Sequence, residues 1–310
     1  MKRLTALVLA FALLGGPLAA GQTIQWISNA RQGVAKAQAR GLPVLFYVRG
    51  KASDDDSSIV RDQRRAFRDP RVVRLVRERF VPVRLANSNE TRALLRDLGA
   101  PVQSDQLVVA TPGGKYLGRI GTDNSRNANS LLQGLQDLFN TYRGEVFRSR
   151  VAKTLSNEDA KPAELMRALD LVQGLTITQA DELVARLLDR PRLSSRLRKR
   201  VYDTLAHLST RRAVEKLLEV APLDKLAGKA LARCTPEGAT YMLDALDPGK
   251  LELHVIAYEA VTKICKIKKT RPRGFWKSAD ADTQMREIAR VREQVQRVAK
   301  RWKERYGKWR

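Results

Sequence analysis

The chain of 310 residues is poor in the residues that most often carry catalysis and cross-linking. It has two cysteines, Cys234 and Cys265, and two histidines, His207 and His254, all in its second half. Two cysteines cannot build the disulfide framework of a small secreted scaffold. The sequence contains no set of residues at metal-ligand spacing, no glycine-rich phosphate loop and no paired histidine and acid. It therefore predicts no metal, no cofactor and no catalytic residue.

Long apolar runs are also absent beyond the N-terminus. The first residues combine the basic Lys2 and Arg3, an uncharged apolar stretch over 4–14, Gly-Gly-Pro at 15–17 and Ala-Ala-Gly at 19–21. That order is typical of a secretory signal peptide. We therefore expect residues 1–21 to be a signal peptide and the mature protein to be exported, either periplasmic or secreted. An uncleaved N-terminal anchor is the alternative.

Acidic residues are scarce relative to basic ones. The chain has 58 Lys and Arg against 33 Asp and Glu, and without Lys2 and Arg3 the net charge is +23. Such an excess favours an anionic partner, which is an acidic protein, an anionic envelope polymer or the phosphate-rich face of a membrane in peripheral contact. Export argues against nucleic acid. A solvated surface without a specific partner is the alternative, and the sequence does not indicate an oligomeric state.

Residues 22–145 show alternating helix and strand patterns. Continuous apolar runs predict strands over 42–48, 80–85, 106–110 and 116–120, because a strand covered on both faces is apolar throughout. Apolar residues at helical spacing predict helices over 26–40, 58–67, 70–76 and 91–98 and from residue 124 onward. Asp69 is expected to cap the third of these helices, with Pro70 at its first position.

The order of these elements resembles an exported thioredoxin-like module. Three local phrases carry the resemblance: Gly41-Leu42-Pro43-Val44-Leu45 after a helix with Trp26, Phe67-Arg68-Asp69-Pro70-Arg71-Val72-Val73, and Thr111-Pro112-Gly113-Gly114-Lys115. The resemblance covers about residues 24–145. It implies a central sheet between helices, with an active-site loop after the first strand.

The residues of the redox site are missing from this module. Where redox enzymes of the family carry Cys-x-x-Cys, the chain carries Ser53, Asp54, Asp55 and Asp56. The position of the family's cis-proline, just before the third strand, falls at Asp105. Redox exchange needs a thiolate, so the resemblance implies a thioredoxin-like domain that lacks redox chemistry. The acidic run is interpreted as a helix cap and charged loop, with a weak cation site as the alternative.

The second half is predicted to be entirely helical. A polar linker is placed at 146–162, followed by a basic α-helical domain over 163–310. Helical patterns occur over 163–172, 179–188, 194–208, 211–220, 225–234, 237–246, 251–267 and 281–308. Residues 205–222 align with 231–248 at an offset of 26, which resembles short HEAT-like repeats. An irregular helical-hairpin bundle is the alternative. Cys234 and Cys265 are either two separately buried thiols or a disulfide, and the sequence leaves both alternatives open.

The last predicted helix and the loop before it concentrate the positive charge. Residues 263–310 contain 17 basic and 5 acidic residues, a net of +12. The apolar stripe of the helix predicts packing on the rest of the helical domain, and its basic and aromatic residues predict contact with an anionic surface. The candidate contact residues are Lys268, Lys269, Arg271, Arg273, Lys300, Arg301, Trp302, Arg305, Lys308 and Trp309.

Together these observations predict an α/β thioredoxin-like domain followed by an all-α domain. We expect an exported, non-catalytic interaction scaffold that binds a protein or an anionic envelope surface. The alternative is a thiol-disulfide oxidoreductase or a chaperone-like protein of the thioredoxin family that uses Cys234 or Cys265.

Overall fold

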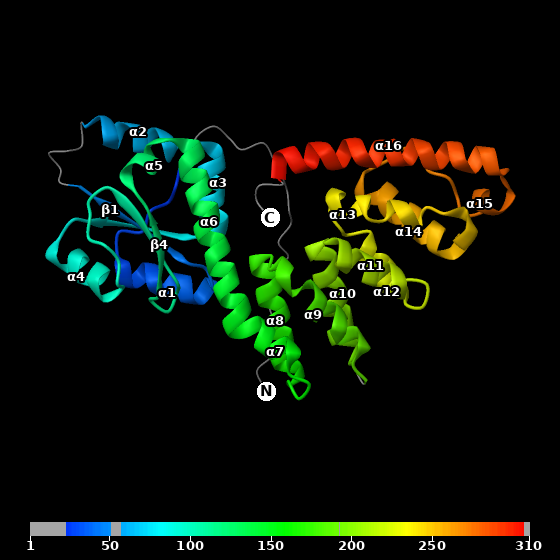
Figure 1. Cartoon of the computed structure of the whole chain (residues 1–310), viewed down its shortest axis with the longest axis horizontal. Helices are drawn as coiled ribbons and strands as arrows, with labels where there is room; N and C mark the ends of the chain where they lie inside the picture. The colour runs from blue at the N-terminus through cyan, green and yellow to red at the C-terminus, as the bar shows by residue number, and fades with distance from the viewer. Residues whose placement is uncertain (1–22, 51–56, 192, 307–310) are drawn as a thin grey trace, which may run out of the picture. The chain divides into compact units, whose positions relative to one another are not determined.

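The computed structural model describes residues 23–50, 57–191 and 193–306. The predicted signal peptide and the predicted redox-site positions Ser53–Asp56 lie outside the described residues. The chain divides into two compact units, residues 1–135 and 136–310. The first unit contains a small mixed sheet with helices, and the second is helical, as the sequence predicted (Figure 1).

The sheet of the first unit has four strands in the order β2-β1-β3-β4. The strands are β1 (Val44–Arg49), β2 (Val81–Ala86), β3 (Gln106–Ala110) and β4 (Tyr116–Ile120). Strand β1 pairs in parallel with β2 and antiparallel with β3, and β3 pairs antiparallel with β4. Strands β1 and β3 are central and almost wholly buried. Their continuous apolar runs follow from this burial on both faces, and all four predicted strands are confirmed.

Helices surround this sheet, and several of them begin at capping residues that are visible in the sequence. The helices are α1 (Ala30–Arg40), α2 (Ser58–Ala66), α3 (Pro70–Arg79), α4 (Asn89–Asp97), α5 (Thr122–Arg126) and the first part of α6 (Ala128–Val146). Asp69 caps α3 by accepting from the N–H of Arg71 at 2.8 Å, with Pro70 at the first helical position, as predicted. Helix α1 approaches β2 closely, because a Cβ on Gly33 would lie 2.2 Å from a methyl carbon of Val83.

The structure differs from the prediction over the expected linker at 146–162. The boundary between the units lies between Leu135 and Gln136, within α6. After α6 the chain continues as a π-helical turn (Phe147–Val151) and α7 (Ala152–Ser156), so only 157–161 is not helical. Val151 and Leu155 are buried and extend the apolar pattern of α6. The polar run at 148–150 hid this continuation in the sequence.

The second unit contains a series of helical hairpins. Its α-helices are α8 (Pro162–Leu175), α9 (Asp181–Arg186), α10 (Ser195–Leu208), α11 (Arg211–Val220), α12 (Lys225–Leu231), α13 (Pro236–Thr240), α14 (Leu251–Ile264), α15 (Phe275–Ser278) and α16 (Ala281–Tyr306), with α6 and α7 before them. Helix α10 packs between α8 and α12, and α12 also packs on α14. Helix α11 packs on α9, and α13 packs on α16.

The repetition in this unit is unequal. The first helices of successive hairpins begin at residues 162, 195, 225 and 251, so the spacing shortens from 33 to 30 to 26 residues. The predicted offset of 26 matches only the last spacing. The predicted helix over 237–246 is divided into α13 and a 3-10 turn at Leu243–Ala245. Thr176 and Ser209 end α8 and α10 in the same way, each in the left-handed conformation.

Ion pairs link neighbouring hairpins. Asp170 pairs with Arg200, Glu182 with Arg212, and Asp203 with Arg233. In each pair the two residues are 30 positions apart in the sequence. These pairs neutralise arginines of α10, α11 and the α12–α13 connection by carboxylates of the preceding hairpin.

The structure buries both cysteines of the helical unit and one of its two histidines. Cys234 and Cys265 are both buried and are not joined in a disulfide. His207 is exposed on α10, and His254 is fully buried on α14, where its ring lies 4.1 Å from the ring of Trp276. No helix in the described parts of the chain is long and apolar enough to cross a membrane.

Candidate functional site

Asp105 lies beside the end of β1, where the loop that was predicted to lack redox cysteines begins. Its backbone N–H donates to the carbonyl oxygen of Val48 at 2.7 Å. Its Oδ1 accepts from the N–H of Gly50 at 3.0 Å, and Gly50 is the last described residue before 51–56. The structure therefore brings the position matched to the family's proline next to the entrance of the matched loop.

The conformation of Asp105 is incompatible with proline. Its φ is 57°, in the left-handed region, whereas a proline ring holds φ near −65° and has no N–H to donate. Aspartate tolerates this region better than most residues. Gly50 is fitted to it, because a Cβ there would lie 2.7 Å from Asp105 Oδ2. No peptide bond in the described ranges is cis.

A buried polar network extends from Asp105 into the unit. The side-chain amide of Gln63 donates to the carbonyl oxygen of Asp105 and to Oγ of Ser125, both at 2.7 Å. The hydroxyl of Tyr47 donates to Oε1 of Gln63 at 3.1 Å and lies 3.4 Å from Asp105 Oδ1. Burial, and then the charge of Asp105, raise the pKa of Tyr47 to about 12, so the phenol stays neutral.

This network holds Asp105 and the end of β1 in position. Its groups bond to one another, and Gln63 and Ser125 are fully buried. Sequence reasoning missed Tyr47, Gln63 and Ser125. One signal was available, since Gln63 interrupts the apolar side of α2 between Val60 and Ala66, where a polar residue needs a buried partner.

Cys234 and Cys265 are the two thiols that the alternative redox function would use. Both lie in the helical unit, and burial raises the pKa of Cys265 to about 11. Disulfide exchange needs an accessible thiolate, and a raised pKa disfavours it. The described residues also include no group of three or more His, Cys, Asp or Glu that could hold a metal ion.

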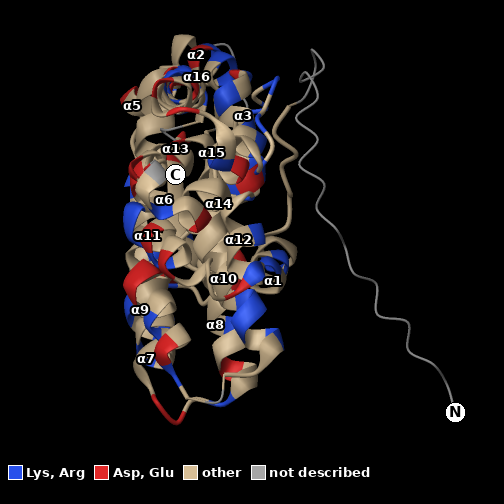
Figure 2. Cartoon of the chain, turned by 90° about the vertical axis from the view of Figure 1, so that its right-hand side faces the viewer, with Lys and Arg blue, Asp and Glu red and all other residues tan. Residues whose placement is uncertain are grey.

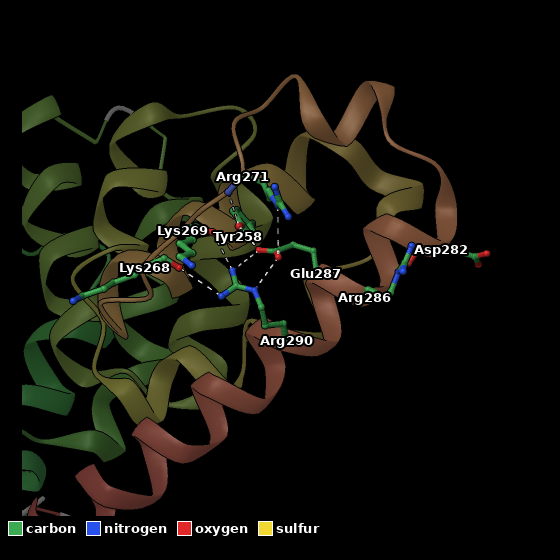
Figure 3. A network of polar contacts seen from close by, with 8 residues as sticks. All are labelled: Tyr258, Lys268, Lys269, Arg271, Asp282, Arg286, Glu287 and Arg290. Carbon is green, nitrogen blue, oxygen red and sulfur yellow. Dashed lines mark hydrogen bonds and ion pairs between the residues drawn. The ribbon is translucent and has the colours of Figure 1, made fainter.

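The second candidate site is the basic loop, defined as residues 266–273 between α14 and α15. Lys266 and Lys269 both have positive φ, 51° and 57°, and Ile267 between them is buried. The guanidinium of Arg290 on α16 donates to the carbonyl oxygens of Lys268 and Lys269 at 3.5 and 3.2 Å. The basic loop is therefore anchored by its backbone, while Lys268 and Lys269 remain exposed (Figure 3).

Glu287 on α16 is the centre of this anchor. Its side chain is 5% exposed and accepts two hydrogen bonds from Arg290, at 2.9 and 2.6 Å. The Tyr258 hydroxyl on α14 donates to the same carboxylate at 2.7 Å and accepts from the backbone N–H of Arg271 at 2.8 Å. One carboxylate thus connects α14, the basic loop and α16 (Figure 3).

The electrostatics of this network favour a charged carboxylate and a neutral phenol. Burial by itself would raise the pKa of Glu287, but the hydrogen bonds from Arg290 and Tyr258 and the charges of Arg290 and Arg271 hold it below its usual value. Burial, and then the hydrogen bond to Glu287, raise the pKa of Tyr258 to about 12. The network therefore keeps its charge pattern at neutral pH.

The predicted tail residues do not share one face of α16. The buried side of the helix carries Ile288, Val291, Val295 and Ala299. Trp302 continues this side and is half-buried, with its ring 5.8 Å from that of Tyr306. Lys300, Arg301 and Arg305 are exposed, and a step of about 100° per residue turns Lys300 roughly 160° away from Trp302. Lys308 and Trp309 lie outside the described residues.

Comparisons with known proteins add no assignment for either site. No protein-family model matches the chain, and neither a curated protein nor a solved structure matches it. We therefore infer the function from the geometry around Asp105 and Glu287.

We predict that Asp105→Ala destabilises the first unit by about 1–3 kcal/mol, because it removes the acceptor of the buried Gly50 N–H. Asp105→Asn keeps an acceptor oxygen and tolerates positive φ, so its loss should stay under about 1 kcal/mol. Urea denaturation followed by circular dichroism measures both variants. Equal losses in the two variants would contradict the role assigned to the acceptor oxygen of residue 105.

We predict that Glu287→Gln lowers the unfolding free energy of the helical unit by about 1–3 kcal/mol, because Arg290 loses its buried anion. The matched control is Glu293→Gln on the same helix, since Glu293 forms an exposed pair with Arg297. That control should cost less than about 1 kcal/mol. Thermal and urea denaturation measure the difference, and indistinguishable variants would contradict the central role of Glu287.

Proposed function

We propose that this chain is an exported, non-catalytic interaction scaffold that binds an anionic partner through the basic loop. In this proposal the first unit is a thioredoxin-like module without redox chemistry, and the second is a HEAT-like stack of helical hairpins. The parallel pair β1–β2 and the antiparallel hairpin β3–β4 support the first assignment. The packing of α8, α10, α12 and α14 in series supports the second.

The observation that carries the proposal is the uneven distribution of ion pairs in the helical unit. Acidic and basic residues are interleaved along its hairpin helices (Figure 2). There, Arg200, Arg212 and Arg233 each pair with a carboxylate, and Lys216 pairs with Asp189 at 3.1 Å. These four basic side chains are neutralised by carboxylates within the same unit.

The basic loop does not neutralise its charge. Within the described ranges, Lys268, Lys269 and Arg273 are exposed and form no ion pair. The segment 263–310 carries a net +12. Unpaired like charges repel one another, and binding to an anionic surface relieves that repulsion. The attraction between the basic loop and such a surface also speeds their association. The basic loop is also held in place before any partner arrives, which lowers the ordering cost of binding.

The position of Trp302 favours the basic loop over the end of α16 as the contact. Trp302 lies with the packed side of the helix, so it does not present an aromatic contact beside Lys300. The basic loop instead presents several unpaired cations on a fixed backbone. An acidic protein surface and an anionic envelope surface both satisfy this charge pattern, and export favours the envelope.

We predict that replacing Lys268 and Lys269 with glutamine weakens binding of the mature chain to vesicles of phosphatidylcholine and phosphatidylglycerol by roughly 30-fold. Each lysine near an anionic surface contributes about 1 kcal/mol. Co-sedimentation measures the loss. Binding should also fall steeply with added salt, because exposed charges are screened over about 8 Å at physiological ionic strength.

The matched control replaces Lys225 and Lys229 with glutamine. These two lysines are exposed on α12 and form no ion pair in the part of the chain that the structure describes. The control removes the same charge at a different place and should change binding less than threefold. Equal losses in the two double variants would mean that binding follows net charge and that the basic loop is not the site.

A further inference from the structure

We propose that Arg271 is a phosphate-binding residue, whose guanidinium fork holds a phosphate monoester at the basic loop. This inference rests on the proposed function, because it gives the chemical class of the anion that the basic loop binds. The two proposals differ in what produces binding. The proposed function depends on positive charge, whereas phosphate binding by Arg271 depends on the planar geometry of one arginine.

Arg271 is held in position by contacts that leave its fork open. Its backbone N–H donates to the Tyr258 hydroxyl at 2.8 Å, and its guanidinium lies over the ring of Phe275, 5.0 Å from the centroid. Its Nε lies 3.8 Å from Oε2 of Glu287, which is an ion pair but too long for a hydrogen bond. No described residue accepts from its two Nη atoms, and the side chain is 51% exposed.

In the same network, the guanidinium of Arg290 uses its Nε and both Nη atoms as hydrogen-bond donors to the protein. Its Nε and Nη2 bond to Glu287, and its two Nη atoms also reach the carbonyl oxygens of Lys268 and Lys269. Arg290 is therefore used to build the network and compensates the single negative charge of Glu287. The charge of Arg271 remains in excess, and its donors remain available to a ligand.

The surroundings of Arg271 favour phosphate over a carboxylate. A guanidinium fork binds either group through two parallel hydrogen bonds. A phosphate monoester carries a charge of about −1.5 to −2 at pH 7 and three acceptor oxygens. Arg271 can bind two of these oxygens, and the exposed lysines of the basic loop add positive potential around the phosphate. Figure 3 shows Lys268 extending away from the network, so this lysine acts through its field at longer range.

The position of Arg271 also limits the cost of binding. Stacking on Phe275 and the bond from its backbone to Tyr258 restrict the side chain before a ligand is present. An arginine that is already ordered loses less conformational entropy when it forms two hydrogen bonds. Replacement with lysine keeps the charge but removes both the fork and the planar stacking surface.

The test compares Arg271→Lys with Arg286→Lys in the mature chain. Arg286 is exposed on α16 and bonds only to neighbours on its own helix, so it is a charge-conserving control. Binding is measured to phosphatidylcholine vesicles that contain either phosphatidic acid, a phosphate monoester, or phosphatidylglycerol, a phosphate diester, at matched surface charge. Circular dichroism verifies that each variant is folded.

We expect Arg271→Lys to lose roughly tenfold in affinity for phosphatidic acid vesicles and to bind phosphatidylglycerol vesicles like the unchanged chain. Arg286→Lys should match the unchanged chain on both. Inorganic phosphate is then added to the vesicle-bound chain, and sodium chloride at equal ionic strength is added in a parallel sample. If phosphate displaces the chain from the vesicles more than sodium chloride does, Arg271 recognises the phosphate group alone. If it does not, Arg271 recognises the phosphate only as part of the lipid headgroup at the membrane.

The outcomes separate this inference from the proposed function. If Arg271→Lys behaves like the unchanged chain on both vesicles while the Lys268 and Lys269 double variant loses binding, the charged loop stands and the phosphate fork is overturned. If the unchanged chain binds neither vesicle, the proposed function fails at the membrane. Equal losses by Arg271→Lys on both vesicles would also overturn the preference for a monoester.

Discussion

The buried carboxylate of Glu287 is the interaction on which the arrangement of the basic loop depends. A carboxylate with only 5% exposure is costly unless it is paired and hydrogen-bonded. Arg290 and Tyr258 satisfy that requirement, and the same two side chains bond to the backbone of the basic loop. The need to compensate one buried charge thus fixes a segment that has no regular secondary structure. The lysines of that segment need no partner within the fold.

The first unit uses a carboxylate in a comparable way. Asp105 accepts from the N–H of Gly50 and holds the chain at the end of β1. A proline cannot adopt its backbone conformation or donate its N–H to Val48. The hydrogen bonds of Asp105 therefore order the chain where β1 ends and β3 begins. In both units a carboxylate orders an irregular segment beside a regular element.

Local signals in the sequence predicted much of the fold and only the outline of the sites. Burial on both faces made β1 and β3 readable as apolar runs, Asp69 with Pro70 marked α3, and α11 has its predicted bounds of 211–220. The partnership of Tyr258 with Glu287 could not be predicted, because these residues are 29 positions apart and meet only when α14 and α16 pack. By contrast, the apolar stripe of α16 correctly predicted which side of this helix packs, because Ile288, Val291 and Val295 on it are buried.

The central claim is that the basic loop is ordered before it meets a partner. Hydrogen–deuterium exchange at the backbone amide of Arg271 tests it most directly, because that amide donates to the Tyr258 hydroxyl and lies outside every helix. We expect slow exchange in the unbound chain and fast exchange after Tyr258→Phe, with the amides of α11 unchanged. Exchange at the rate of an unstructured peptide in the unbound, unsubstituted chain would contradict it.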